Sequence, residues 1–190
     1  MPRIASATEP RRSEDQGDRI SRGVAAIMAH RPEIAGAIGD VMGALRTTGT
    51  LSPRVIELIR LRIAFHNQCR SCMAVRYRSA VDDGVTEDLV CSLEQPEEAD
   101  DLTEAERAAL RYADLFATNH LAIGDAEYDA LRVHFTEGEI VEIGFNCAID
   151  VGLGRLVATW KVTDDLPERF QADGTAPIVP WGRDGVLASG

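Results

Sequence analysis

The sequence has few aromatic side chains and no excess of basic ones. Phenylalanine, tryptophan and tyrosine make up only 5% of its 190 residues, so aliphatic residues must fill the core. Lysine and arginine number 20 against 31 acidic residues, which gives a formal net charge of −11. Nucleic acids and anionic membranes are bound by clustered cations. The composition therefore argues against nucleic-acid and membrane partners.

Long apolar runs are also missing. The polar segment from Met1 to Arg19 has no apolar stretch of the kind that a secretory signal requires. No uninterrupted apolar run approaches the length of a membrane span. We therefore expect a cytoplasmic protein with no segment in a membrane.

Cysteine occurs only four times, at positions 69, 72, 91 and 147. Structural disulfides are rare in the cytoplasm, so these residues indicate redox, metal-binding or buried thiols. A structural zinc site normally has four protein ligands, and neither a second CxxC nor an HxxxH accompanies the first pair. Cys91 and Cys147 stand alone in apolar stretches, which is typical of buried, inert thiols. We expect neither a metal nor a cofactor.

Helical patterns fill most of the chain. Apolar residues recur at helical spacing from Ile34 to Leu45, and Ser52-Pro53 is a typical helix start. Capping boxes begin at Thr103 and Thr136. The expected helices span about 20–30, 32–48, 53–68, 69–81, 86–93, 103–119, 125–135 and 136–160. We predict an all-α fold of about seven or eight helices.

The domain organisation follows from these patterns. Residues 1–16 are expected to form a flexible N-terminus, and residues 17–163 a single helical domain. Proline, glycine and aspartate dominate residues 164–190, which we expect to be an extended C-terminal tail. Gly152 and Gly154 lower helix propensity inside the last helix, which indicates close packing against a neighbouring helix or subunit.

Cys69-Arg70-Ser71-Cys72 is the motif with the clearest chemistry. Two thiols three residues apart on a helix share one face, so they can form a disulfide or bind one soft metal ion. A helix N-terminus stabilises thiolates. Arg76, four residues after Cys72, is expected on the same face and would lower the pKa of that thiol. Redox chemistry, a metal site and an inert pair are the three interpretations of this motif.

The surroundings of this motif resemble the carboxymuconolactone decarboxylase family, and more closely its AhpD-like alkylhydroperoxidase branch. The resemblance rests on a helix with Glu57 twelve residues before Cys69, followed by the CxxC. The matching residues are Leu51–Ala64 (LSPRVIELIRLRIA), Asn67–Cys72 (NQCRSC) and Gly84-Val85. It implies an all-α AhpD-like helical bundle and thiol-dependent reduction of hydroperoxides, a peroxiredoxin-type activity.

The resemblance also implies roles for the two thiols. Cys72 would attack the hydroperoxide and become a sulfenic acid, and Cys69 would resolve it to a disulfide. A dithiol reductant protein would then reduce the disulfide. Members of the family are commonly homo-oligomers, so a dimer, trimer or hexamer is expected.

One position departs from the family pattern, because Arg76 stands where the family has a histidine. Arginine remains protonated near neutral pH and cannot act as a general base. Three replacements are open: His66 could supply the imidazole, Glu57 could act directly or through water, or Arg76 could hold a standing thiolate with Glu57 balancing its charge. For Glu57, a structural salt bridge to Arg76 or Arg60 competes with a role in the site.

Two other functions are compatible with the sequence. A non-catalytic oligomer of the same fold that senses redox state or binds a partner is favoured by the missing histidine. A lactone decarboxylase-type enzyme belongs to the other branch of the family, which does not depend on a CxxC. The catalytic candidates for the peroxidase are Cys72, Cys69, Glu57, Arg76 and His66.

Overall fold

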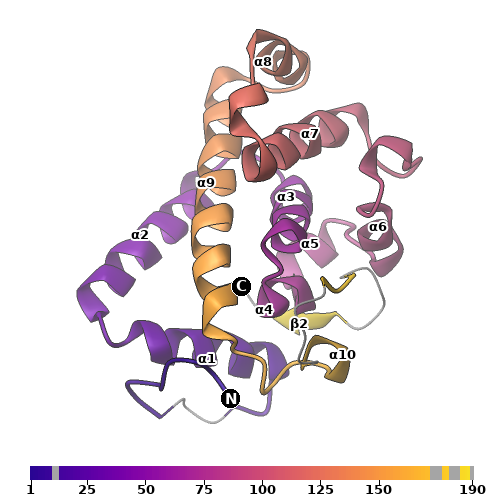
Figure 1. The fold of residues 1–190 in the computed structure, drawn as a ribbon. Coiled ribbons are helices and arrows are strands. Elements are labelled where there is room, and N and C mark those ends of the chain that lie inside the picture. The colour runs from indigo at the N-terminus through magenta and orange to yellow at the C-terminus, as the bar shows by residue number, and fades with distance from the viewer. Residues whose placement is uncertain (10–12, 172–176, 180–184, 189–190) are drawn as a thin grey trace.

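The computed structural model describes residues 1–9, 13–171, 177–179 and 185–188, and helices account for most of them (Figure 1). The prediction of an all-α bundle is confirmed, with ten α-helices in the described residues. In chain order the elements are α1 (Gln16–Met28), α2 (Pro32–Thr48), α3 (Pro53–Asn67), α4 (Arg70–Ala74), β1 (Val75–Tyr77), α5 (Arg78–Asp82), α6 (Glu87–Ser92), η1 (Pro96–Glu98), α7 (Glu104–Thr118), η2 (His120–Ala122), α8 (Asp125–Arg132), α9 (Glu137–Trp160), α10 (Glu168–Gln171) and β2 (Val186–Ala188), where η marks a 3₁₀-helix. None of the described helices combines the length and apolar character needed to cross a bilayer.

Helix starts follow the capping residues of the sequence. The Ser52 hydroxyl accepts a hydrogen bond from a backbone N–H in the first turn of α3, and Pro53 begins that helix. Capping boxes at Thr103 and Thr136 open α7 and α9 as predicted. The helix α8 starts at Asp125, as predicted, with Gly124 at the cap position, but it ends at Arg132 and not at 135.

The helix α3 lies at the centre of the bundle and is buried on two faces. On one face Ile59 and Ile63 pack with α7 and α9, against residues such as Ala113, Ile143 and Cys147. On the other face Leu58 and Leu61 pack against α6 and α7, where Val90, Leu93 and Leu110 are buried. Figure 1 shows α9 running along the molecule beside this central helix. A helix that is apolar on more than one face must be enclosed in this way.

The segment after the two cysteines differs from the prediction. A single helix over 69–81 is wrong, because the helix stops at Ala74 and the chain extends through β1 before α5 begins. β1 pairs in parallel with β2, and Val75 lies opposite Val186. β-branched Val75 fits a strand well. The partner strand lies 111 positions later in the chain, so local periodicity carries no signal of the pairing.

The C-terminal part of the chain packs on this segment. Phe170 in α10 is fully buried, in a cluster that also contains Met73, Val75 and Val186. β2 lies between β1 and α1. A Cβ at Gly17 in α1 would stand 2.5 Å from the carbonyl oxygen of Leu187, so only glycine fits there. At the N-terminus, the Arg3 N–H donates to the Trp160 carbonyl at 2.8 Å.

We predict that Gly17→Ala destabilises the protein by about 1–3 kcal/mol, because the added methyl group overpacks the contact with β2. An ordinary helical Gly→Ala change is stabilising by up to about 1 kcal/mol, so the expected sign is reversed. Gly23→Ala in the same helix is the matched control, since its nearest neighbour is a flexible Val162 methyl group at 3.2 Å. Chemical denaturation measures both changes, and equal stability of the two variants would contradict the prediction.

Candidate redox site

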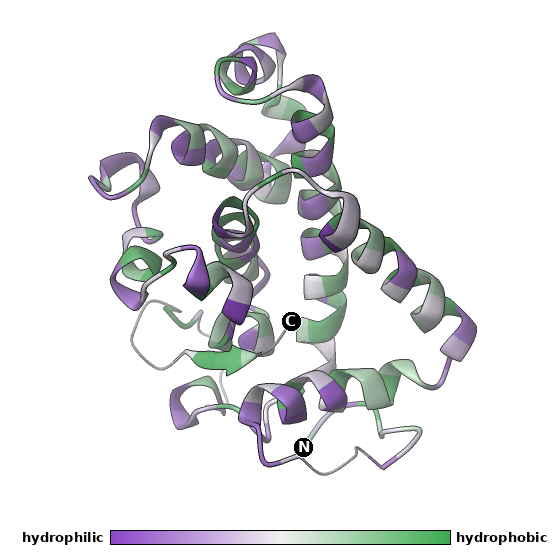
Figure 2. Cartoon of the chain, turned by 180° about the vertical axis from the view of Figure 1, so that it is seen from behind, coloured by the Kyte–Doolittle hydropathy of each residue, from purple (hydrophilic) through white to green (hydrophobic). Residues whose placement is uncertain are grey.

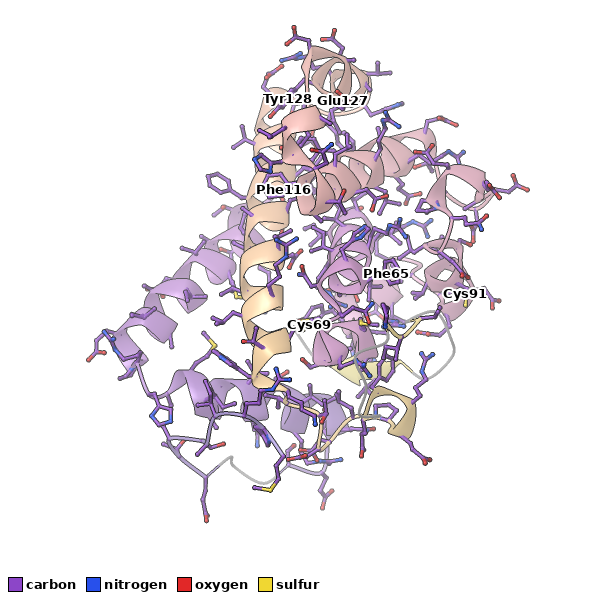
Figure 3. The ribbon with its side chains drawn as sticks, in the orientation of Figure 1. Phe65, Cys69, Cys91, Phe116, Glu127 and Tyr128 are labelled. Atoms are coloured by element: carbon purple, nitrogen blue, oxygen red, sulfur yellow. A yellow bond between two sulfur atoms is a disulfide. The ribbon has the colours of Figure 1, made fainter. Side chains whose placement is uncertain are left out.

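Cys69 and Cys72 are joined in a disulfide, with their Cα atoms 5.2 Å apart. Cys69, labelled in Figure 3, caps the N-terminus of α4 and is completely buried. Cys72, in the first turn of that helix, is half-buried. The Sγ atom of Cys69 lies 3.6 Å from the Ser71 hydroxyl. Of the two thiols, Cys72 is therefore the one that a molecule from solution can reach.

The turn before the cysteines has an uncommon backbone conformation. Gln68 adopts the left-handed region, with φ of 50° and ψ of 35°, and this ends α3. The chain then reverses direction, and the Cys69 N–H donates to the Ala64 carbonyl at 3.2 Å. The reversal carries the cysteines back toward the middle of α3.

Arg60 of α3 lies beneath the redox pair and binds its backbone. The guanidinium donates to the carbonyl oxygens of Cys72 and Val75, each at 2.7 Å. The break between α4 and β1 leaves these carbonyl groups without hydrogen-bond donors from a following helical turn, and the Arg60 guanidinium supplies the missing donors. Burial alone would lower the pKa of Arg60, but the adjacent Glu57 carboxylate raises it above its ordinary value. Arg60 therefore carries a permanent buried charge.

Glu57 pairs with this arginine. Its two carboxylate oxygens accept hydrogen bonds from Arg60 at 2.7 and 2.8 Å, and one also faces the Tyr77 N–H at 3.3 Å. Only 2% of Glu57 is exposed, so its charge needs these partners. Of the two salt bridges considered from the sequence, the structure contains the one with Arg60.

Arg76 lies in β1, so its predicted place on the helical face of Cys72 is wrong. Its guanidinium donates to the Met73 carbonyl at 2.8 Å and to Glu87 at 2.9 Å. Burial lowers the pKa of Arg76, with Glu87 opposing this shift and the nearby Arg60 adding to it. Arg76 thus binds the end of α4, and its direct ion-pair partner is Glu87, whereas Glu57 pairs with Arg60.

His66 sits at the end of α3 and interacts with α7. Its Nε2 atom lies 2.7 Å from Asp114, which also accepts a hydrogen bond from Arg62 at 2.6 Å. Burial would raise the pKa of Asp114, but these two partners lower it below its ordinary value. The structure therefore joins His66 to a charge cluster with α7, while Cys69, Cys72, Glu57 and Arg76 come together around α4 and β1.

Asp150 is a candidate that the sequence analysis missed. It lies on α9, and its backbone carbonyl accepts a hydrogen bond from the Asn67 amide at 2.8 Å. Burial raises the pKa of its carboxyl to about 7, with Arg60 opposing the shift and Glu57 adding to it. An acidic residue within the apolar run of α9 was the available signal.

Close packing explains one of the two α9 glycines, Gly152 and Gly154, that the sequence analysis singled out. A side chain at Gly154 would collide with the Asn67 amide, so the expected close approach is present there. At Gly152 a Cβ would meet nothing within 4 Å.

The two remaining cysteines are free thiols. Cys147 is buried, and burial together with Asp150 raises the pKa of its thiol, whereas Cys91 is half-buried. Within the described part of the chain, no group of three or more His, Cys, Asp or Glu side chains is placed to hold a metal ion.

Known proteins share both this sequence region and this fold. The model of the carboxymuconolactone decarboxylase family matches residues 32–115. Uncharacterized proteins from two strains of Mycobacterium tuberculosis are 33% identical over 120 residues, which is 62% of this chain. The chain spans 42% of the length of these relatives.

Two solved structures are similar in fold. One is a protein of unknown function from Agrobacterium tumefaciens that is connected by name with antioxidant defence and AhpD. It has a TM-score of 0.61 and 26% identity, over 70% of this chain and 91% of its own. The other is an uncharacterized peroxidase-related protein from Ralstonia eutropha with an alkylhydroperoxidase AhpD core. Its TM-score is 0.67 at 23% identity, over 82% of each chain, and it supports the fold alone.

The helical bundle, the cysteine pair after a helix that carries a buried glutamate, and the matching family model agree with one another. Over residues 32–115 the chain is similar to the carboxymuconolactone decarboxylase family, and its fold is that of the two AhpD-like structures.

Proposed function

We propose that the protein is a thiol-dependent peroxidase and disulfide oxidoreductase that uses Cys69 and Cys72. The observation that carries this proposal is the pairing of a buried Cys69 with a more accessible Cys72 at disulfide distance. A dithiol of this kind can pass between two oxidation states without moving the backbone far. The substrate is a hydroperoxide, and a dithiol reductant protein restores the thiols.

The reaction follows from the different exposure of the two sulfur atoms. The Cys72 thiolate attacks one peroxide oxygen, the O–O bond breaks, and the alkoxide takes up a proton and leaves as an alcohol. Cys72 is then a sulfenic acid. The Cys69 sulfur attacks the Cys72 sulfur, the S–O bond breaks, and hydroxide leaves with the Cys69 proton as water. The hydroperoxide has gained two electrons, and the two thiols have become a disulfide.

Arg60 is the cation best placed to support the thiolate. It binds the Cys72 carbonyl directly, and Glu57 holds it there. The sequence-based proposal gave this role to Arg76, with Glu57 as its balance. Arg76 binds the next carbonyl, of Met73, and retains a supporting role with Glu87 as its partner. Both guanidiniums also hold the short helix in place, so the position of the attacking sulfur depends on them.

Asp150 is the group that we propose as proton acceptor, through water, in place of the family histidine. The two acceptors considered from the sequence already have partners, because the His66 imidazole is hydrogen-bonded to Asp114 and the Glu57 carboxylate forms a salt bridge with Arg60. Asp150 is half-buried and interacts electrostatically with Arg60 and Glu57, and its pKa of about 7 suits proton transfer near neutral pH. Its position on α9, opposite the α3–α4 junction, is fixed by the bond between its carbonyl and Asn67.

A homo-oligomer in the cytoplasm completes the proposal. No residue of α2 is buried, and an open groove of about 630 Å³ separates α2 from α9. It is lined mainly by apolar residues, among them Ile34, Ile38 and Val41 of α2 and Ala148, Ile149 and Leu153 of α9. Figure 2 shows hydrophobic residues recurring along both helices. An apolar groove of this size supports contact with a second copy.

A redox sensor without peroxidase activity is the second candidate. Arg76 at the histidine position favours it, because a protonated guanidinium accepts no proton. It would show reversible oxidation of Cys69 and Cys72 with negligible peroxide turnover. Nothing in the site specifically favours a lactone decarboxylase over these two.

We expect Cys72→Ser to abolish hydroperoxide reduction and Cys69→Ser to stop turnover after one sulfenic acid per chain has formed. The reason is that the first variant lacks the attacking sulfur and the second lacks the resolving one. Peroxide consumption with a general dithiol reductant measures turnover, and a sulfenic-acid probe with mass spectrometry locates the product. Cys91→Ser is the matched control and should retain wild-type turnover. Full activity of Cys72→Ser would exclude the proposed peroxidase.

We expect Asp150→Asn to remove a step near pH 7 from the pH profile of Cys72 oxidation, because the acceptor is then lost.

The Asp150 carboxyl group should also make the stability of the protein depend on pH. Its pKa is higher in the folded chain than in the unfolded chain, so its stabilising contribution is complete below about pH 4 and is lost as the pH rises through about 7. Relative to Asp150→Asn, the wild type should therefore lose up to about 1.4 kcal/mol per pH unit across that range. Parallel stability curves for the two proteins would contradict this.

We expect Val41→Glu to convert the protein to a smaller species, because Val41 is 51% exposed on the apolar groove. Light scattering after size-exclusion chromatography gives the mass of each species. Val133→Glu places the same charge at an apolar residue that is 75% exposed on α8, away from the groove, and should leave the mass unchanged. A wild type that is monomeric at tens of micromolar would refute the proposed assembly.

A further inference from the structure

The C-terminal segment lies against the residues that flank the disulfide. Ile178 is held by the side chain of Gln68, the residue immediately before Cys69. The side-chain oxygen Oε1 of Gln68 accepts a hydrogen bond from the Ile178 N–H at 2.8 Å, and the side-chain nitrogen Nε2 faces the Ile178 carbonyl oxygen at 3.3 Å. The same amide nitrogen donates to the Phe65 carbonyl at 2.9 Å, which fixes its orientation. One amide side chain therefore binds both polar groups of one backbone residue.

A second backbone contact follows the disulfide. β1 begins three residues after Cys72 and pairs in parallel with β2, in the register Val75 with Val186, Arg76 with Leu187 and Tyr77 with Ala188. Val186 and Ala188 turn inward and are buried, while Leu187 is half-buried on the opposite face. A two-residue alternation of this kind is that of a normal strand at a sheet edge.

The two contacts place extended backbone on both sides of the accessible thiol. Cys72 packs against the apolar cluster that includes Val75, Val186 and the partly buried Ile178. The residues that hold the segment, Gln68 and β1, recognise main-chain groups, and this form of recognition tolerates many side-chain sequences. The surface beside the redox pair is thus built to bind an extended polypeptide.

We propose that this surface is the docking site for an extended segment of a protein redox partner, and that the chain's own residues 177–179 and 186–188 occupy it as a competing cover. The proposal rests on the function proposed above and specifies how the reductant is recognised. Disulfide exchange requires the partner sulfur to approach Cys72 closely, and an extended segment held by Gln68 and β1 would carry a cysteine to that point.

The cover is held by packing and hydrogen bonds. A Cβ at Gly185 would lie 2.9 Å from the Arg76 Cγ atom, so the cover fits closely against β1. Contacts of this kind open locally without unfolding the whole protein. Weakening them should uncover the docking site while the helical bundle remains folded.

The exchange step balances without a further reactant. A partner thiolate attacks the Cys72 sulfur and forms a mixed disulfide, the Cys69–Cys72 bond breaks, and its electron pair leaves on Cys69, which takes up a proton. A second partner thiolate then attacks the partner sulfur of the mixed disulfide and releases Cys72. The protein disulfide gains two electrons, and two partner thiols become one disulfide.

The test compares reduction of the oxidised full-length protein by two reductants. One is the peptide acetyl-Thr-Val-Cys-Val-Thr-amide, whose β-branched residues favour an extended chain. The other is dithiothreitol, which has no backbone. Val186→Asp places a charge on the buried face of β2 and should release the cover. Leu187→Asp is the matched control, because the neighbouring side chain lies on the opposite face.

We expect the peptide to reduce Val186→Asp about tenfold faster than Leu187→Asp. A tenfold change corresponds to a loss of about 1.4 kcal/mol in the free energy with which the cover binds its site. The rate with dithiothreitol should rise much less. A peptide N-methylated at the residues beside its cysteine lacks the N–H donors and should lose the gain. Quantifying free thiols by mass spectrometry gives these rates. The measurement involves no hydroperoxide, so its result does not depend on whether the protein is a peroxidase.

Two outcomes would overturn the proposal. Equal acceleration with the peptide, its N-methylated form and dithiothreitol would mean that the segment blocks access without marking a docking site. No acceleration in any variant would mean that it covers nothing that a reductant needs. Ile178→Ala guards against unfolding of Val186→Asp, because it removes only a partly buried side chain of the cover and leaves Gln68 and β1 intact, and it should change the rates in the same direction.

Discussion

The contact on which the redox site depends is the pair of hydrogen bonds from Arg60 to the Cys72 and Val75 carbonyls. A helix of five residues cannot satisfy its own carbonyl groups, and water has little access at this depth. Arg60 brings a buried charge to these groups, and Glu57 makes that charge tolerable. The most conspicuous carboxylate of α3 is therefore first a structural partner, and its effect on the thiols is transmitted through Arg60.

This arrangement changes how the loss of the family histidine is understood. Arg76 occupies a strand, with Glu87 as partner, so it does not project from the helix that carries Cys72. Charge around the dithiol is distributed over two arginines and three carboxylates, those of Glu57, Glu87 and Asp150. Burial raises the pKa of Asp150 to about 7, and this carboxyl group comes from a different helix.

Much of the fold was predictable because its signals are local. Ser52, Thr103 and Thr136 mark helix starts through side-chain bonds that span three residues, and the two apolar faces of α3 indicated its central position. The Cys69–Cys72 pair was equally local. The strand β1 was not predictable, because its partner is 111 positions away and three residues show no periodicity. The hydrogen bonds from Arg60 to the Cys72 and Val75 carbonyls, and from His66 to Asp114, depend on how long side chains reach between elements, and sequence spacing does not encode this.

The parallel pairing of β1 with β2 also has a consequence for folding order. Helices α3, α7 and α9 form the centre of the bundle and precede β2 in the chain, so they can pack together before β2 has been synthesised. The environment of the dithiol is complete only after Val186–Ala188 has been synthesised. During that interval Cys72 lies beside an unpaired strand edge, with Val75 uncovered. Nascent chains of this protein should therefore be more prone to mixed disulfides and to strand-to-strand association than the finished molecule.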